Sequence, residues 1–322
     1  MEAVRKMGYS KIISMNLRRY SILVLLFILI IIATILSPHF LTVGNFLNLL
    51  QQSAVIGIVS IGMTFVIITG GIDLSVGSIL ALAGMIVGIL LKNGMVISLA
   101  VLITLVAGAL LGGISGFITT KARVPAFLAT LAMMVAARGM ALLATDGQPV
   151  FGLPPAFNVF GAGFFLGIPV SGIIWILLTL VAAFILKYSA FGRRLYAVGG
   201  NPEAAYLSGV KVNKIIAVTY IISGLLSAFA GIVLASWLTV SQPTAGSGAE
   251  LNAIAAVVLG GASLSGGTGG VMGTFIGVLL MSIITNIFNL IGLSSYYQSI
   301  FMGVIIVLAL VLNDFVVGGG EK

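Results

Sequence analysis

Apolar runs of about 20 residues follow one another along most of this chain, and they restrict its fold more than any other feature. A helix of about that length crosses about 30 Å of hydrocarbon, and in lipid only helices and closed barrels satisfy every backbone polar group. Of 322 residues, 60% are hydrophobic and 7% are charged, whereas an average soluble domain has about 25% charged residues. The sequence therefore predicts an all-α polytopic membrane protein, with a single transmembrane domain over residues 1–322 and no large soluble domain.

About ten spans are expected, and the basic residues between them predict the orientation. The expected helices lie near 21–37, 52–69, 74–91, 95–119, 125–143, 171–187, 215–235, 250–265, 270–291 and 296–313. Basic residues cluster in segment 1–20, at Lys121 and Arg123, and in the connection 188–214. Since cytoplasmic loops carry an excess of Lys and Arg, these segments and both termini are placed in the cytoplasm. Helix breakers flank the segment at 250–265, which fits a short span or a re-entrant segment.

Composition and motifs argue against several other classes of protein. The net charge of +8 comes from residues in short connections between apolar runs, where topology accounts for them, so no nucleic-acid partner is expected. The chain has no cysteine and one histidine, and no metal site is expected. Neither GxxxxGK[ST] nor GxGxxG occurs, and the seven acidic residues form no convincing acid/base pair. The chain itself is therefore expected to bind no cofactor and to catalyse no reaction.

Small and polar residues in the spans are expected to join helices. Gly108, Gly112 and Gly116 are spaced four apart in the expected helix 95–119, and small-xxx-small patterns let helix backbones approach closely. Polar side chains such as Gln51 and Asn286 are expected mostly to hydrogen-bond between helices. These features predict packing rather than ligand binding.

A nine-residue pattern, GGxxLSxG followed by a hydroxyl residue, occurs twice in the chain. GGIDLSVGS at 70–78 aligns without gaps with GGASLSGGT at 260–268. In each copy, two glycines end one helical segment, and the Asp or Ser side chain caps the next by accepting a hydrogen bond from a freed backbone N–H. Repeated, interrupted helices are typical of transporters. The predicted translocation path and gate comprise Gly70, Gly71, Asp73, Ser75, Gly77, Gly260, Gly261, Ser263 and Ser265.

Asp73 has two interpretations. As a cap, its carboxylate satisfies a freed N–H and places negative charge at a helix N-terminus, where the helix dipole favours it. As a pathway residue, it would carry a coupling ion or contact a polar solute, since acids within the membrane are usually functional. Both interpretations remain open from the sequence.

The basic connection 188–214 contains a short, well-delimited helix. Asn201 suits the N-cap, Pro202 the first helical position and Glu203 the first turn, while Gly209 ends the helix. The pattern predicts a helix of about two turns outside the membrane. By itself it is typical of a loop helix packed on the bundle.

Glu203-Ala204-Ala205 followed by Gly209 resembles the EAA coupling loop of ATP-binding-cassette (ABC) importer permeases. Further matching motifs are GGIDLSVGS at 70–78, FGR at 191–193, GNPEAA at 200–205, SQPTAG at 241–246 and AAVVLGGASL at 255–264. Together they cover nearly the whole chain in order. The chain resembles the ribose-type monosaccharide ABC importer permease family.

The resemblance implies an ABC importer permease fold, partners and site residues. Two permease copies would form the pore, a cytoplasmic tandem-domain ATPase would bind ATP and Mg²⁺ beneath it, and an extracytoplasmic binding protein would deliver the sugar. The location would be the cytoplasmic (inner) membrane of a prokaryote. The implied ATPase-coupling residues are Asn201, Pro202, Glu203, Ala204, Ala205 and Gly209, with Arg193 and Arg194 either as flanking contacts or as topology-setting charges.

The substrate is not settled by the motifs. Ribose fits best, while relatives of this family carry other pentoses or hexoses, or autoinducer-2. A different class, an ion-coupled secondary transporter that uses Asp73 and no ATPase, is the remaining alternative.

Overall fold

The computed structural model describes residues 23–294, 296–305 and 307. Its helices are Leu23–Leu36, α2 (Val43–Ile68), α3 (Val76–Lys92), α4 (Ile97–Lys121), α5 (Ala126–Leu143), α6 (Val170–Tyr188), α7 (Ala190–Gly200), α8 (Pro202–Leu207), α9 (Val212–Leu238), α10 (Ala249–Leu259) and α11 (Val271–Leu290), followed by helical residues 296–305. Between α5 and α6 lie a short 3-10 helix (Pro155–Val159) and a two-stranded hairpin, β1 (Phe164–Phe165) and β2 (Ile168–Pro169). The predicted cytoplasmic segment 1–20 lies outside the described residues.

The helical, multi-pass architecture is confirmed. Six helices of the described chain are long and apolar enough to cross a membrane, namely α2, α4, α5, α6, α9 and α11. Leu23–Leu36, α3 and α10 are apolar but shorter, and the expected span 296–313 runs beyond the described residues. The count of about ten spans therefore remains a prediction.

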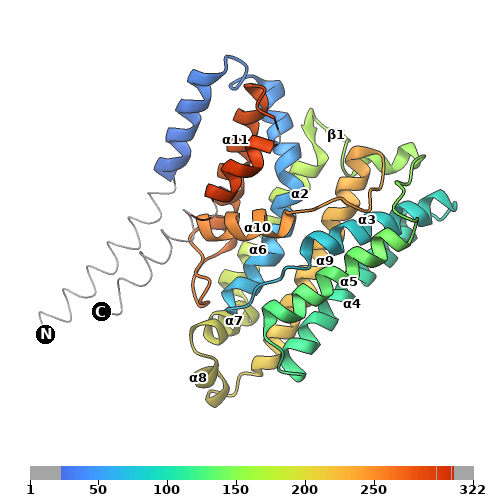
Figure 1. The fold of residues 1–322 in the computed structure, drawn as a ribbon. Coiled ribbons are helices and arrows are strands. Elements are labelled where there is room, and N and C mark those ends of the chain that lie inside the picture. Colours follow the sequence, from blue (N-terminus) through green and yellow to red (C-terminus); the bar gives the residue numbers. More distant parts are fainter. Residues whose placement is uncertain (1–22, 295, 306, 308–322) are drawn as a thin grey trace, which may run out of the picture.

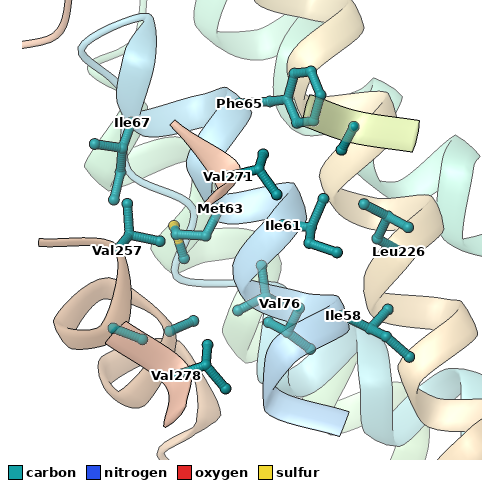
Figure 2. Close-up of a cluster of buried hydrophobic side chains, with 14 of the residues drawn as sticks. Ile58, Ile61, Met63, Phe65, Ile67, Val76, Leu226, Val257, Val271 and Val278 are labelled. Carbon is teal, nitrogen blue, oxygen red and sulfur yellow. The ribbon is translucent and has the colours of Figure 1, made fainter. Parts of the chain in front are cut away.

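Helix α2 lies at the centre of the bundle and is buried over most of its length from Leu49 to Ile68. Its side chains Ile58, Ile61, Met63 and Phe65 form a cluster with residues from α3, α9, α10 and α11, which Figure 2 shows. Because lipid is as apolar as these side chains, van der Waals packing and hydrogen bonds hold such helices together. A central helix contacted on all sides then fixes the positions of the elements around it.

The expected start of α2, near residue 52, is wrong by nine positions. The helix begins at Val43, where the Thr42 side chain accepts a hydrogen bond from Asn45 N. Polar residues in this first part have partners far away in sequence: Asn45 bonds with Asn286 of α11 (2.8 and 3.0 Å), and Gln51 donates to Gly161 O (2.7 Å). The Asn45–Asn286 bonds confirm the interhelical role expected for Asn286, whereas Gln51 joins α2 to the loop between the 3-10 helix and β1.

The glycine row on α4 packs against α9, as the sequence predicts. A Cβ atom added at Gly112 would collide with Tyr220 O, and one added at Gly224 would collide with Gly108 O. Each glycine thus lies directly against the backbone of the other helix. The close approach joins α4 firmly to α9.

Helix α10 is a short element rather than a full span. In Figure 1 it lies across the long helices at mid-height of α2, and the segment before it enters from the end of the bundle near β1. The helix ends at Leu259, earlier than the expected residue 265, because Gly260 and Gly261 follow and Gly261 has a φ of +88°. Helix α8 lies at the opposite end of the bundle (Figure 1).

Candidate functional site

The break between α2 and α3 is organised by the buried carboxylate of Asp73. Gly70 turns the chain after α2 with a φ of +78°. One carboxylate oxygen of Asp73, Oδ1, accepts hydrogen bonds from the backbone N–H (3.0 Å) and the hydroxyl of Ser75, and Oδ2 accepts from the hydroxyl of Ser223 on α9 (2.7 Å). The freed N–H that the capping interpretation requires is therefore that of Ser75. The carboxylate also joins the break to α9.

The break between α10 and α11 repeats this local geometry. Ser263, which aligns with Asp73, accepts a hydrogen bond from the backbone N–H of Ser265 (3.2 Å). Gly261, Gly266, Gly267 and Gly269 all have positive φ, a conformation that glycine adopts at low cost. In both aligned stretches, a side-chain oxygen thus accepts a hydrogen bond from the backbone N–H two residues further along the chain.

The two breaks meet in space at the end of helix α7. Gly267 N donates a hydrogen bond to Ile68 O at the end of α2 (2.9 Å), and a Cβ at Gly266 would lie 2.9 Å from Gly70 N. A Cβ at Gly199 of α7 would collide with Ile68 O and lie 2.6 Å from Gly267 N. We call this contact of Ile68, Gly199 and Gly267 the glycine junction.

A tyrosine on α7 adds a second contact to the α10–α11 break. The Tyr196 hydroxyl donates to Gly269 O (2.8 Å), and burial raises the pKa of this phenol above its ordinary value of 10.0, so it remains a donor at neutral pH. A cavity of about 940 Å³ lies beside this contact, lined in part by Lys187, Tyr196 and Gly270. Helix α7 is therefore joined to the second break by both backbone and side chain.

The loop helix α8 is capped as the sequence predicts. Asn201 is its N-cap and accepts a hydrogen bond from Ala204 N (2.9 Å), Pro202 and Glu203 occupy the first turn, and Gly209 follows the helix with a φ of +81°. Ala205 is buried, whereas Tyr206 and Leu207 are 70% and 78% exposed. The helix thus presents two large apolar side chains away from the bundle.

Arg138 of α5 is a charged residue within a spanning helix. Its Nη1 donates to Pro243 O (2.8 Å) and to Ala245 O (2.9 Å). These carbonyls belong to the segment between α9 and α10. Ser241 of the same segment forms an antiparallel bridge with Val150. Arg138 therefore holds the segment that leads into α10.

Residues 45–310 match the family described as a branched-chain amino acid transport system permease component. The chain belongs to this permease family. The ribose import permease of Bacillus subtilis (strain 168) is 50% identical to it over 290 residues, or 89% of this chain and 90% of that protein. The ribose import permease of Haemophilus influenzae is 47% identical over 296 residues, covering 90% and 91%, and the L-arabinose ABC transporter permease of Azospirillum brasilense is 34% identical over 301 residues, covering 93% and 88%. No solved structure is significantly similar to the chain.

These similarities confirm the resemblance to ribose-type permeases that the motifs indicate. In the permease, the two aligned stretches meet at Gly70 and Ser265: a Cβ at Gly70 would lie 3.5 Å from Ser265 O, although these residues are 195 positions apart. Asp73, Ser75, Gly77 and Ser263 are buried, Gly71 and Gly260 are half-buried, and Gly70, Gly261 and Ser265 are exposed. Their role in a path or gate stays a prediction.

The predicted coupling residues of the permease lie together at the end of the bundle that carries α8. Arg193 and Arg194 on α7 are exposed, and Arg193 Nη1 donates to Tyr188 O (3.3 Å). The sequence reasoning missed Gly199, Tyr206, Leu207 and Arg138. Arg138 could have been found from the sequence, because it is a basic residue inside an apolar run. The close approach at Gly199 could not, because nothing in the sequence distinguishes this glycine from the other glycines among the 42 in the chain.

Proposed function

We propose that this permease is the membrane subunit of an ABC importer that carries a monosaccharide, ribose, into the cytoplasm. Sequence similarity supports ribose, because relatives named ribose import permeases reach 50% identity while an L-arabinose permease reaches 34%. The chain works as a transport subunit, and ATP and Mg²⁺ bind to a separate ATPase. A second permease copy and an extracytoplasmic sugar-binding protein complete the importer.

The exposed helix α8 is the surface on which the ATPase docks. Tyr206 and Leu207 are apolar side chains exposed to water, and such residues at a loop tip favour a protein partner. Glu203 in the first turn adds a charge, and the Asn201 cap holds the helix in shape without the partner. On this assignment α8 lies in the cytoplasm, as do both termini.

The glycine junction carries the motion from α8 to the helix breaks. Helix α7 ends at Gly200, one residue before the N-cap of α8, and Gly199 contacts the ends of both breaks. A shift of α8 on ATP binding therefore reaches α2, α10 and α11 through backbone contacts. This observation supports alternating access, in which bundled helices move between outward-open and inward-open states.

Uptake and co-purification test the proposal together. In cells whose own copy is replaced, Glu203→Lys is expected to abolish [¹⁴C]ribose uptake and to reduce the ATPase recovered with the tagged permease, while membrane abundance stays unchanged. Lys92→Glu, a charge reversal at the exposed last residue of α3, is the matched control and is expected to retain both. Normal uptake by Glu203→Lys contradicts the coupling role. A wild-type permease that takes up no ribose, or that co-purifies with no ATPase, contradicts the importer itself.

A further inference from the structure

Arg138 lies in the last third of the apolar helix α5. It is twelve residues beyond Ala126 and five before Leu143, which is about 8 Å along the helix axis from that end. The side chain is half-buried, and none of the motifs of the family resemblance includes it. A charged group at this depth normally faces a water-filled cavity or another polar group rather than lipid.

The guanidinium of Arg138 is only partly used by its contacts. Within the described residues its recorded hydrogen bonds come from Nη1, to Pro243 O and Ala245 O. A guanidinium has five N–H donors, so those on Nε and Nη2 remain for another acceptor.

Glu250 supplies an acceptor in the same region. It lies in the first turn of α10, five residues after Ala245, whose carbonyl Arg138 binds, and it is half-buried. Its carboxylate lies against Gly77, in the first turn of α3. The predicted path residue Gly77 is thus in contact with this site.

Further polar side chains follow along the same segment. Gln242, Thr244 and Ser247 before α10 are exposed, and Asn252, two positions after Glu250 and therefore on another face of α10, is half-buried. They add donors and acceptors to the segment that leads into α10. The arginine and Glu250 together are electrically neutral, so the surface suits an uncharged, polyhydroxylated solute better than an ion.

We propose that Arg138 and Glu250 bind sugar hydroxyl groups in the part of the translocation path remote from α8. The free guanidinium donors and the carboxylate oxygens are the complementary partners of hydroxyl groups. Thr244 and Asn252 flank Glu250 in the same segment of the chain. The proposal rests on the proposed function only in naming a sugar as the solute.

Thiol labelling tests whether this surface is lined by water, because the chain contains no cysteine. Thr244→Cys and Asn252→Cys are expected to react with a membrane-impermeant methanethiosulfonate applied to the side remote from α8. Leu110→Cys, 63% exposed on α4, is the lipid-facing control and is expected to stay unlabelled. Leu166→Cys, 87% exposed in the hairpin loop, reports full reaction. Failure of both Thr244→Cys and Asn252→Cys to react, while Leu166→Cys reacts, overturns the proposal.

Transport assays of the assembled importer test the sugar contact itself. Glu250→Gln is expected to lower ribose uptake about tenfold while ATP hydrolysis stimulated by the binding protein changes little. If the pair only stabilises the fold by its charges, Arg138→Gln/Glu250→Gln recovers uptake, which overturns the proposal. If the double variant still loses ribose uptake while it retains ATP hydrolysis, the result supports the proposed sugar contact. Labelling needs neither ribose nor the ATPase, so its failure is distinguishable from failure of wild-type uptake.

Discussion

At the scale of single residues, Asp73 combines burial with a complete set of hydrogen bonds. Both carboxylate oxygens accept bonds, from Ser75 and from Ser223 of α9. An amide of the same shape can accept from Ser75 with its oxygen and donate to the Ser223 hydroxyl with its nitrogen. The geometry thus gives the carboxylate a structural role that needs its shape more than its charge.

We therefore expect Asp73→Asn to retain most ribose uptake and Asp73→Leu to lose it. The leucine leaves the Ser75 N–H and the Ser223 hydroxyl without an acceptor, at about 1–3 kcal/mol of folding stability for each unsatisfied group. Uptake and thermal unfolding in detergent measure the two effects. Complete loss of uptake in a stable Asp73→Asn protein would instead favour ion coupling, and uptake that follows a proton or sodium gradient would support that alternative.

Gly199 is the second residue with a sharply defined requirement. A Cβ at this position would collide with Ile68 O, whereas at the neighbouring Gly200 it would meet no atom within 4 Å. Gly199→Ala is expected to push α7 away from the breaks and to lower uptake more than it lowers ATPase recovery. Gly200→Ala is the matched control and should behave as wild type; equal behaviour of the two variants would contradict the glycine junction.

At the scale of elements, the contact between α4 and α9 shows how helices associate here. Adjacent glycines on α4 differ completely in their surroundings: Gly112 lies against the backbone of α9, whereas a Cβ at Gly113 would come no closer than 3.5 Å, to Ile221 Cγ1. Only at Gly112 does the contact with α9 require a residue without a side chain.

Gly112→Ala is consequently expected to destabilise the bundle by about 1–3 kcal/mol, as overpacking does, and Gly113→Ala to leave it unchanged. The melting temperature of the purified permease measures both variants. A similar melting temperature for the two would show that α4 and α9 adjust to the added methyl group. In that case the close backbone contact between α4 and α9 is not what holds these two helices together.

At the scale of the whole molecule, polar contacts join helices from the N-terminal and C-terminal parts of the sequence. Asn45 and Asn286 are 241 positions apart, and each side chain donates to the other. Replacing Asn45 leaves the buried Asn286 amide without this partner, and replacing Asn286 leaves Asn45 with its bond to Phe40 O (2.9 Å), whereas replacing both removes the penalty of the unpaired amide.

Asn45→Leu/Asn286→Leu should therefore be less destabilised than the sum of its single variants. Pairs of this kind contribute about 0.6 kcal/mol on average in membrane proteins, so the coupling is to be measured by a double-mutant cycle of unfolding in mild detergent. Strict additivity would mean that the amides are satisfied separately.

Local signals in the sequence determine the elements of this protein. Apolar runs specify the spans, the Asn201-Pro202-Glu203 sequence specifies the start of α8, and the paired glycines specify where α2 and α10 end. Each of these depends on interactions within a few residues, which periodicity and capping rules describe. The family, too, follows from motifs along the chain.

Only the tertiary structure decides which of these elements meet. It places Gly199 against Ile68 and Gly267, Arg138 against Pro243 and Ala245, and Asp73 against Ser223. Such contacts join segments more than a hundred positions apart or use glycine backbones that carry no distinctive side chain. The sequence determines where the helices break. Long-range bonds support the start of α2 at Val43, and packing around α2 determines which breaks come together, because close approach depends on the shape of every neighbouring helix at once.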